Sequence, residues 1–382
     1  KKSEPYQEQW IYPTQTGLSG KPAIADIGGS SRNEIIFATK SGSVSALASD
    51  GTTVFETDTG TDRPVGSPVV YDWYDTDQKV VLLPAGNKLY GWNEKGELLP
   101  RFPFVLPEQI TSPLLIGDIN GDGKPEAFVA TASRKLHALN GRGENLEGWP
   151  VTTNSKITSR PTIGEYQKEK VIFAFAGNAA HGWRADGISP APFPTFIEAP
   201  LQGSPVIFKN NVLGNASDGR LYAMGSDPLF RDGPPAESGP GSNALYVSGS
   251  ALNGSPQLKE MKVYSNEKTY HEPIIVTSDV NGSVFLFTAA GKLLFNSNMG
   301  QPAAPSSAPL IVDFNQNGIP NILTLGRYGR LFVWKSTNGN RLDIVPSVSM
   351  KYPVVADVNK NGYAELIAQT DEGVRCWTIF GK

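Results

Sequence analysis

The chain has 382 residues and carries 34 Lys and Arg against 37 Asp and Glu, a formal net charge of −3. This balance excludes the basic field that a nucleic-acid or anionic-membrane partner requires, and no apolar run approaches the roughly 20 residues that span a bilayer. Cys376 is the single cysteine, which excludes an intramolecular disulfide and a cysteine-based metal site. Frequent turns among β-branched and aromatic residues indicate a chain of short strands.

A short segment recurs along the chain, with Ser or Thr close before a Pro and an apolar run after it. Most intervals between these prolines are 44 to 48 residues, and the interval from Pro205 to Pro309 is 104, which equals two periods of 52. Ala244–Val247 stands where the start missing from that interval is expected. Eight units of about 47 residues predict an all-β fold, a single eight-bladed β-propeller of four-stranded antiparallel blades over residues 1–382. The prolines are Pro22, Pro68, Pro113, Pro161, Pro205, Pro309 and Pro353.

The third apolar run of each unit shows which residues share a face. Residues two apart on a strand point to the same side. One face therefore carries two columns of mostly large side chains, and small residues lie between them. We expect the two faces of each blade to pack against its neighbours. The columns are Ser45, Tyr90, His137, His181, Tyr222, Phe285, Phe332 and Arg375, and Leu47, Trp92, Leu139, Trp183, Met224, Phe287, Trp334 and Trp377.

The two ends of the chain fit one blade. The last unit ends at Lys382, soon after its third strand, and Glu8–Pro13 resembles the outer strand that ends another unit at Glu147–Pro150. We predict that residues 8–13 complete the last blade and close the ring, which removes its exposed strand edges.

The repeat is interrupted once, between Gly225 and His271. This segment carries a Gly- and Pro-rich stretch at residues 232–240 and then a polar excursion with Lys259, Lys262 and Lys268. It is either a solvated surface insertion or a loop that shapes a binding face, and the residues do not distinguish the two.

Three loops have the spacing of a calcium site. In the third unit, Asp118, Asn120, Asp122 and Glu126 alternate with glycines, and such oxygen side chains can wrap a hard cation together with the backbone carbonyl of Lys124. We expect the strongest calcium binding in this loop, which has three carboxylates, and weaker binding in the other two loops, which have two and one. The alternative is a self-hydrogen-bonded turn. The equivalent residues are Asp357, Asn359, Asn361, Tyr363 and Glu365, and Asp313, Asn315, Asn317, Ile319 and Asn321.

This loop after a Pro-led strand, together with the Gly148-Trp149-Pro150 ending, resembles the FG-GAP/VCBS-type propeller repeats of integrin α-subunits and many secreted bacterial proteins. The resemblance implies structural calcium and a surface that binds proteins or glycans. Several loops lack the acidic residues, which departs from the pattern. The ring is also similar to quinone-type eight-bladed propellers.

The candidate catalytic residues are few. His137 and His181 stand in a column otherwise filled mainly by Tyr and Phe, which favours a packing role, and Cys376 reads as a buried thiol. The alternative is a carbohydrate-active enzyme resembling a polysaccharide lyase, which Arg327, Tyr328 and Arg330 would serve.

The sequence thus favours a non-catalytic protein that binds a protein or glycan partner. We expect a monomer with no nucleic-acid partner and no transmembrane segment. The chain opens without an initiator Met, which suggests a processed form, and a secreted, periplasmic or cell-surface location, with or without a lipid anchor, is expected.

Overall fold

Each repeat folds into an antiparallel sheet in the computed structural model, which describes residues 4–233, 235–236, 240–265, 268–314 and 317–380. The described residues form strands and turns and no helix, and the eight sheets make the fold an eight-bladed β-propeller. Seven sheets have four strands, and the fifth blade gains a short additional strand. The chain divides into two compact units, Lys1–Ile163 with Arg184–Ile188 and Met350–Ile379, and Gly164–Trp183 with Ser189–Ser349 and Phe380–Lys382.

The first unit holds blades one, two, three and eight. Their second strands are buried almost throughout and are mostly apolar, as expected for strands covered on both faces. The strands are β2 (Ala23–Ala25), β3 (Glu34–Ala38), β4 (Ser43–Leu47) and β5 (Thr53–Asp58); β6 (Val69–Tyr71), β7 (Val80–Ala85), β8 (Lys88–Trp92) and β9 (Phe104–Val105); β10 (Leu115–Gly117), β11 (Glu126–Ala130), β12 (Lys135–Leu139) and β13 (Val151–Thr152); and β31 (Lys351–Ala356), β32 (Ala364–Thr370) and β33 (Gly373–Ile379) with β1 (Tyr6–Tyr12).

The second unit holds blades five, six and seven and most of blade four. The same order of inner to outer strands recurs, with one long hairpin in blade six. The strands are β14 (Thr162–Tyr166), β15 (Glu169–Ala176), β16 (Ala179–Trp183) and β17 (Thr195–Phe196); β18 (Leu201–Phe208), β19 (Asn211–Ala216), β20 (Arg220–Gly225), β21 (Pro235–Ala236) and β22 (Ser242–Tyr246); β23 (Leu252–Ser265), β24 (Lys268–Asp279), β25 (Ser283–Thr288) and β26 (Leu293–Asn298); and β27 (Leu310–Val312), β28 (Asn321–Leu325), β29 (Leu331–Lys335) and β30 (Arg341–Leu342).

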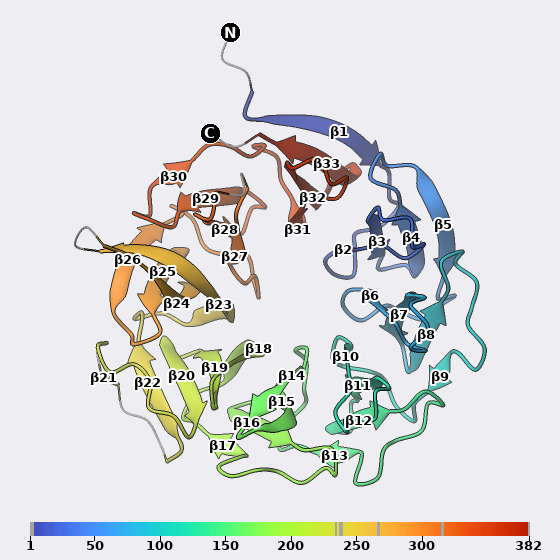
Figure 1. Ribbon diagram of the computed structural model, residues 1–382, viewed down its shortest axis with the longest axis horizontal. Helices are drawn as coiled ribbons and strands as arrows, with labels where there is room; N and C mark the ends of the chain where they lie inside the picture. The colour runs from blue at the N-terminus through green and yellow to red at the C-terminus, as the bar shows by residue number, and fades with distance from the viewer. Residues whose placement is uncertain (1–3, 234, 237–239, 266–267, 315–316, 381–382) are drawn as a thin grey trace. The chain divides into compact units, whose positions relative to one another are not determined.

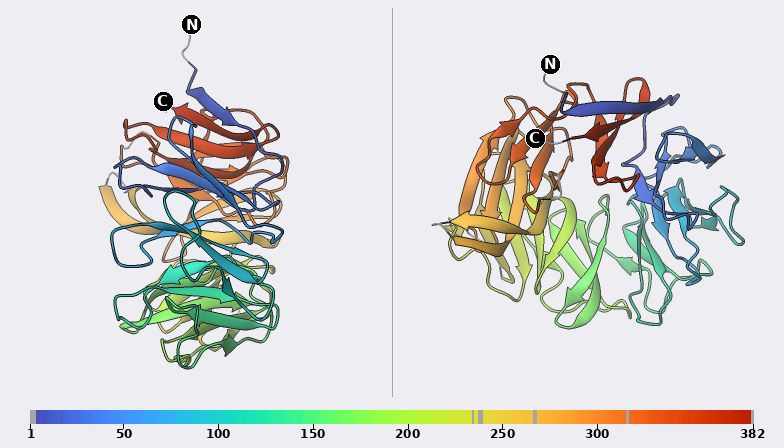
Figure 2. Two further views of the ribbon diagram at one scale, coloured as in Figure 1. Left: turned by 90° about the vertical axis from the view of Figure 1, so that its right-hand side faces the viewer. Right: turned by 45° about the horizontal axis from the view of Figure 1, so that its top comes forward.

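The first strand of the chain completes the last blade, as predicted. β1 pairs antiparallel with β33, from Tyr6 opposite Ile379 to Tyr12 opposite Val374, with an irregularity between Glu8 and Trp10. The pairing is visible from several sides, with the first strand in blue and the last strands in red (Figures 1 and 2). The outer edge of β33 is therefore covered.

The predicted shared face is present in four blades as stacked ring pairs. Along one strand, the rings of Tyr90 and Trp92 stack with centroids 5.5 Å apart, and those of His181 and Trp183 lie 5.3 Å apart. Phe285 with Phe287 and Phe332 with Trp334 repeat this arrangement. The rings of these pairs are buried apart from that of Tyr90, which is partly exposed.

A second contact, repeated in several blades, joins an outer strand to the next blade. An apolar side chain of the outer strand lies against a glycine in the turn after the third strand of the following blade. Phe55 faces Gly96 in this way, and Phe104 faces Gly143. A Cβ atom on either glycine would lie 2.7 Å from the ring, so a side chain there is excluded.

The predicted start of the sixth unit is wrong. Residues 244–247 do not begin a blade, because Ser242–Tyr246 is β22, which pairs with β20 in blade five. Blade six begins in β23, which contains Ser255-Pro256, the same pattern as Ser204-Pro205 in β18. The segment 225–271 accordingly belongs to two blades, and β23 and β24 have 14 and 12 residues, which lengthens the repeat.

Candidate functional site

The loop of the third blade is held by its own side chains. The Asp118 carboxylate accepts the amide hydrogens of Gly121 (2.6 Å) and Gly123 (3.2 Å). Asn120 Oδ1 accepts the Asp122 amide hydrogen, and Asp122 Oδ1 accepts that of Lys124. Asn120 and Asp122 form Asx turns, in which a short polar side chain accepts a backbone amide hydrogen two residues ahead, and Asp118 reaches amides three and five residues ahead.

Glu126 closes this loop from the second strand. It is 2% exposed, its Oε2 accepts the amide hydrogen of Ile119 (3.1 Å), and its Oε1 lies 3.4 Å from Asn120 Nδ2. In blade eight, Glu365 repeats these contacts with Val358 and Asn359. The predicted loops therefore lie where expected, between the first and second strands.

The same turn also forms where the sequence predicted no calcium. Asp26 and Asp72 in blades one and two accept two amide hydrogens each, as do Asp313 and Asp357 in blades seven and eight. The hydrogen-bonded turn is thus common to five blades, whether or not the later loop residues have the oxygen side chains of a calcium site.

The side chains of these loops match the ligands of a calcium site in part. Among the residues that the structure describes, no three His, Cys, Asp or Glu side chains are grouped so that they could hold a metal ion. The oxygens of the Asp118 loop that bond to amides keep further lone pairs. Occupancy by calcium stays a prediction for the loops at Asp118, Asp313 and Asp357, and Asn315 lies outside the described residues.

Burial acts on the glutamates that close the loops. Burial raises the pKa of Glu34 and of Glu365, and the neighbouring Asp26 and Asp357 raise it further, although amide hydrogen bonds oppose the shift. Both glutamates are buried, and Glu34 also contributes to the lining of the pocket described below. Their direct role is to hold the turn against the second strand.

The histidines of the repeat column are buried in the sheets, as the predicted packing role requires. His137 is buried, with Asn145 Nδ2 3.2 Å from its Nδ1 and Thr131 Oγ1 3.5 Å from its Nε2, and burial lowers its pKa. Burial lowers the pKa of His181 to about 4, so this ring is neutral at pH 7 while it stacks on Trp183. A base with such a pKa is mostly unprotonated yet weak at neutral pH.

Cys376 is also buried in a sheet. It lies in β33, is 1% exposed, and burial together with the charge of Glu365 raises the pKa of its thiol. A thiolate is the reactive form of cysteine, so this residue behaves as a small apolar side chain.

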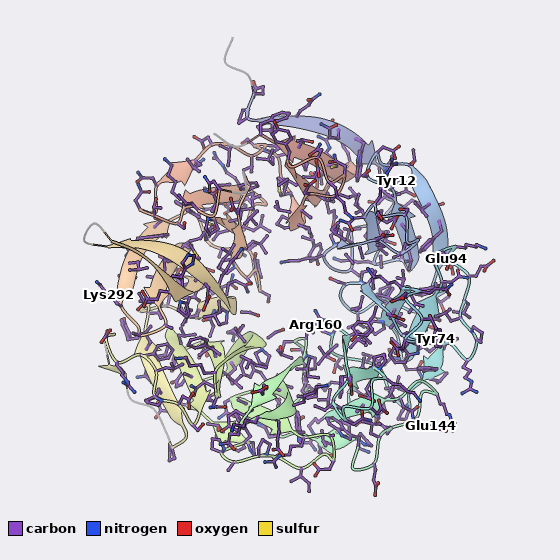
Figure 3. All side chains as sticks on the ribbon, viewed as in Figure 1. Tyr12, Tyr74, Glu94, Glu144, Arg160 and Lys292 are labelled. Carbon is purple, nitrogen blue, oxygen red and sulfur yellow. The ribbon has the colours of Figure 1, made fainter. Side chains whose placement is uncertain are left out.

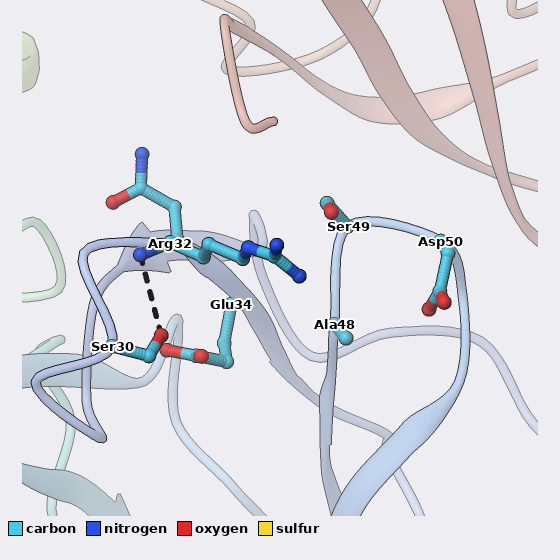
Figure 4. Close-up of a pocket in the computed structure, with 7 residues that line it drawn as sticks. Ser30, Arg32, Glu34, Ala48, Ser49 and Asp50 are labelled. Carbon is cyan, nitrogen blue, oxygen red and sulfur yellow. Dashed lines mark hydrogen bonds between the residues drawn. The ribbon is translucent and has the colours of Figure 1, made fainter. Parts of the chain in front are cut away.

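A pocket of about 390 Å³ lies in blade one beside the Asp26 loop (Figure 4). Its lining includes Ser30, Arg32, Glu34 and Asp50, and the Arg32 side chain extends over Glu34. The hydrogen bond from the Thr52 hydroxyl lowers the pKa of Asp50. Ser30 Oγ accepts the Arg32 amide hydrogen and has no histidine beside it among these lining residues.

Two of the repeat prolines in the first unit directly follow a cationic residue. Lys21 precedes Pro22, and Arg160, labelled in Figure 3, precedes Pro161. Surrounding protein lowers the pKa of both, and no carboxylate contributes to either shift. The repeat pattern places both residues directly before a proline, but nothing in the sequence indicates that their pKa values are lowered.

The residues of the enzyme alternative lie in one turn of blade seven. Arg327, Tyr328 and Arg330 are exposed between β28 and β29, and the Arg330 guanidinium lies 5.4 Å from the centre of the Phe332 ring. No histidine belongs to this blade. The turn exposes an aromatic ring and two cations.

Comparison with known proteins shows the fold alone. No protein-family model matches the chain, and no curated protein sequence matches it. Among solved structures, the chain is similar to BamB from Moraxella catarrhalis, with a TM-score of 0.64, 15% identity and 98% of each chain covered. It is also similar to the C-terminal WD40 domain of Sif2, with a TM-score of 0.61, 13% identity and 99% of each chain covered.

A third similar structure contains a bound protein. This is BBS1N in complex with ARL6DN, with a TM-score of 0.56 and 16% identity over 88% of this chain and 99% of that one. Identities this low establish a shared propeller architecture and carry no shared site.

Proposed function

We propose that this chain is a non-catalytic propeller that binds a protein partner. The observation that carries the proposal is the burial of the potentially reactive side chains. His137, His181 and Cys376 are buried in the sheets, and burial lowers the pKa of both histidines and raises the pKa of the thiol. The exposed turns at the blade ends are then the surfaces available for function. Propellers of the same architecture include one solved with a protein bound, which supports the proposal as an analogy.

Calcium at the Asp118 loop belongs to this proposal as a structural element. The side chains of Asp118, Asn120, Asp122 and Glu126 and the carbonyl of Lys124 would hold it. A bound cation would neutralise carboxylates that the turn brings together. Membership of the FG-GAP/VCBS-type repeats and a secreted or cell-envelope location are part of the same proposal and rest on the repeat resemblance.

The test is capture followed by reconstitution. The immobilised full-length chain is exposed to an extract of its source, and proteins displaced by excess free chain are identified, purified and titrated calorimetrically. We expect one protein that binds saturably with fixed stoichiometry. If no protein is displaced by the free chain, or if only a glycan binds saturably, the proposal is wrong.

A further inference from the structure

Exposed apolar side chains mark one end of the second unit. This is the end where the second and third strands of each blade are joined, by residues 217–219, 280–282 and 326–330 in blades five, six and seven. Val280 and Tyr328 lie in two of these turns and are 41% and 73% exposed. Tyr246 lies at the same end, because it pairs with Arg220, the first residue of β20, and it is 48% exposed.

Backbone and side-chain bonds connect these turns into one surface. The Val280 amide donates to the carbonyl of Ala251 (2.9 Å), and Asn281 Nδ2 donates to Ser250 Oγ (2.7 Å), shortly after β22. The Arg327 amide donates to the carbonyl of Pro302 (2.8 Å), in the segment that leads from blade six to blade seven. In blade five, the Val247 amide donates to the carbonyl of Gly219 (3.1 Å), so each of the three turns is bonded to a segment that links successive blades.

The turn of blade seven carries the free positive charge of this end. Arg327 and Arg330 are exposed, and within the described part of the chain neither guanidinium takes part in an ion pair or hydrogen bond. Among the neighbouring acids, Asp218 and the exposed Glu198 lie 3.4 and 3.7 Å from Arg220, and Asp279 accepts the Ser248 hydroxyl at 2.7 Å and the Ser283 amide at 2.9 Å. Two cations thus flank the most exposed aromatic ring of this end.

Arg330 is also partly ordered in advance. Its guanidinium lies over the Phe332 ring at 5.4 Å, and that of Arg341 lies over the same ring at 5.0 Å, while Arg341 pairs with Asp343 at 3.1 Å. Contact with an aromatic ring restricts a long side chain, so less conformational entropy is lost when it binds a carboxylate.

We propose that Tyr246, Val280, Arg327, Tyr328 and Arg330, the blade-end surface, bind a segment of a protein partner that carries carboxylates beside apolar side chains. Tyrosine and arginine are the residue types that most often dominate the free energy of protein interfaces, and arginine binds carboxylates through two parallel hydrogen bonds. Charge complementarity therefore selects an acidic segment, and the side chains of Tyr246, Val280 and Tyr328 supply the contact area. The inference rests on the proposed function and names the surface that performs it.

The experiment measures fluorescence anisotropy of a short labelled peptide in which Glu and Asp alternate with Leu and Phe, and of a matched peptide with Lys in place of the acids. We expect the acidic peptide to bind the full-length chain, more weakly as salt is raised, and the lysine peptide not to bind. Arg327→Glu with Arg330→Glu should weaken binding by roughly tenfold or more, and Tyr328→Ser should weaken it as well. The matched control Arg142→Glu, in an exposed turn of blade three, should leave it unchanged.

The outcomes separate this inference from the proposed function. Equal binding of both peptides, no binding of the acidic peptide, or an unchanged affinity of the double variant with unchanged thermal unfolding overturns the blade-end surface. If the double variant has a lower Tm than the native chain, the peptide affinity of Tyr328→Ser is used as the test instead. A protein captured by the native chain and bound equally by these folded variants would keep the proposed function and place its site elsewhere.

Discussion

The indole ring of Trp10 lies on Gly51, and a Cβ atom on that glycine would come within 2.7 Å of the ring. Trp10 Nε1 also donates to the carbonyl of Ser49 at 2.9 Å. Trp10 belongs to β1 in blade eight and Gly51 to a turn of blade one, so one contact fixes the first strand of the chain onto the blade that follows it. Trp149 repeats the bond in blade three, where its Nε1 donates to the carbonyl of Ala185 at 2.9 Å.

Substitution of Gly51 tests this contact. Gly51 has φ +85°, so Gly51→Ala combines backbone strain with a clash, and we expect it to lower the free energy of unfolding by about 2–4 kcal/mol. The matched control is Gly60→Ala, with φ +65° and no atom within 4 Å of the added Cβ, which should cost about 1 kcal/mol. Urea unfolding measures both, and equal losses would show that the Trp10 contact contributes nothing.

Removal of the first strand tests closure of the last blade. Deletion of residues 1–12 uncovers the edge of β33, and we expect a lower Tm and self-association through the open edge. Light scattering and thermal unfolding report the two effects. Deletion of residues 1–4, which precede β1, is the control and should change neither. A monomeric chain with unchanged Tm after the longer deletion contradicts this role.

The stability of the chain should fall in mild acid because of His181. Burial holds its folded-state pKa at about 4, below the ordinary 6.5, so the unfolded state binds the proton first. The stabilisation is complete above pH 6.5 and is lost as the pH falls to about 4, by about 3 kcal/mol at 1.36 kcal/mol per pKa unit. His181→Phe, which keeps a ring in this column, should flatten that part of the profile. An identical pH dependence in the variant would mean that His181 titrates normally.

Calcium should raise the Tm of the chain, because a ligand that binds only the folded state stabilises it. Thermal unfolding with calcium chloride and with a chelator measures the difference. Asp122→Ala should remove most of it, whereas Asp77→Ala in the blade-two loop should not, since no calcium is expected there. If calcium and chelator give equal Tm values and metal analysis finds no calcium, the loops are metal-free turns.

Much of the fold was predictable because the repeat is local. Period-two alternation identified the shared face of Tyr90 and Trp92, and the likeness of residues 8–13 to Glu147–Pro150 identified the strand that completes the last blade. Two equal periods from Pro205 reach position 257, one residue from Pro256, so the spacing does contain the sixth start. The prediction missed it because the apolar run at residues 244–247, which belongs to β22 of blade five, resembles the start of a unit.

The candidate site was less predictable, because it depends on neighbours distant in sequence. The Asx spacing found the turns at Asp118 and Asp357, but the turns at Asp26 and Asp72 form the same bonds without the full pattern. Tyr246, Val280 and Tyr328 are spread over 83 positions, and only the stacking of successive blades shows that they lie at one end.

Hydrogen–deuterium exchange of the full-length chain, alone and bound to the protein recovered by capture, tests the central claim that this propeller binds a protein through its blade ends. The account predicts slower exchange on binding at residues 246–251, 280–282 and 326–330, with little change in the first unit. Protection confined to other segments would contradict the blade-end surface, and the absence of any saturable protein partner would contradict the proposed function itself.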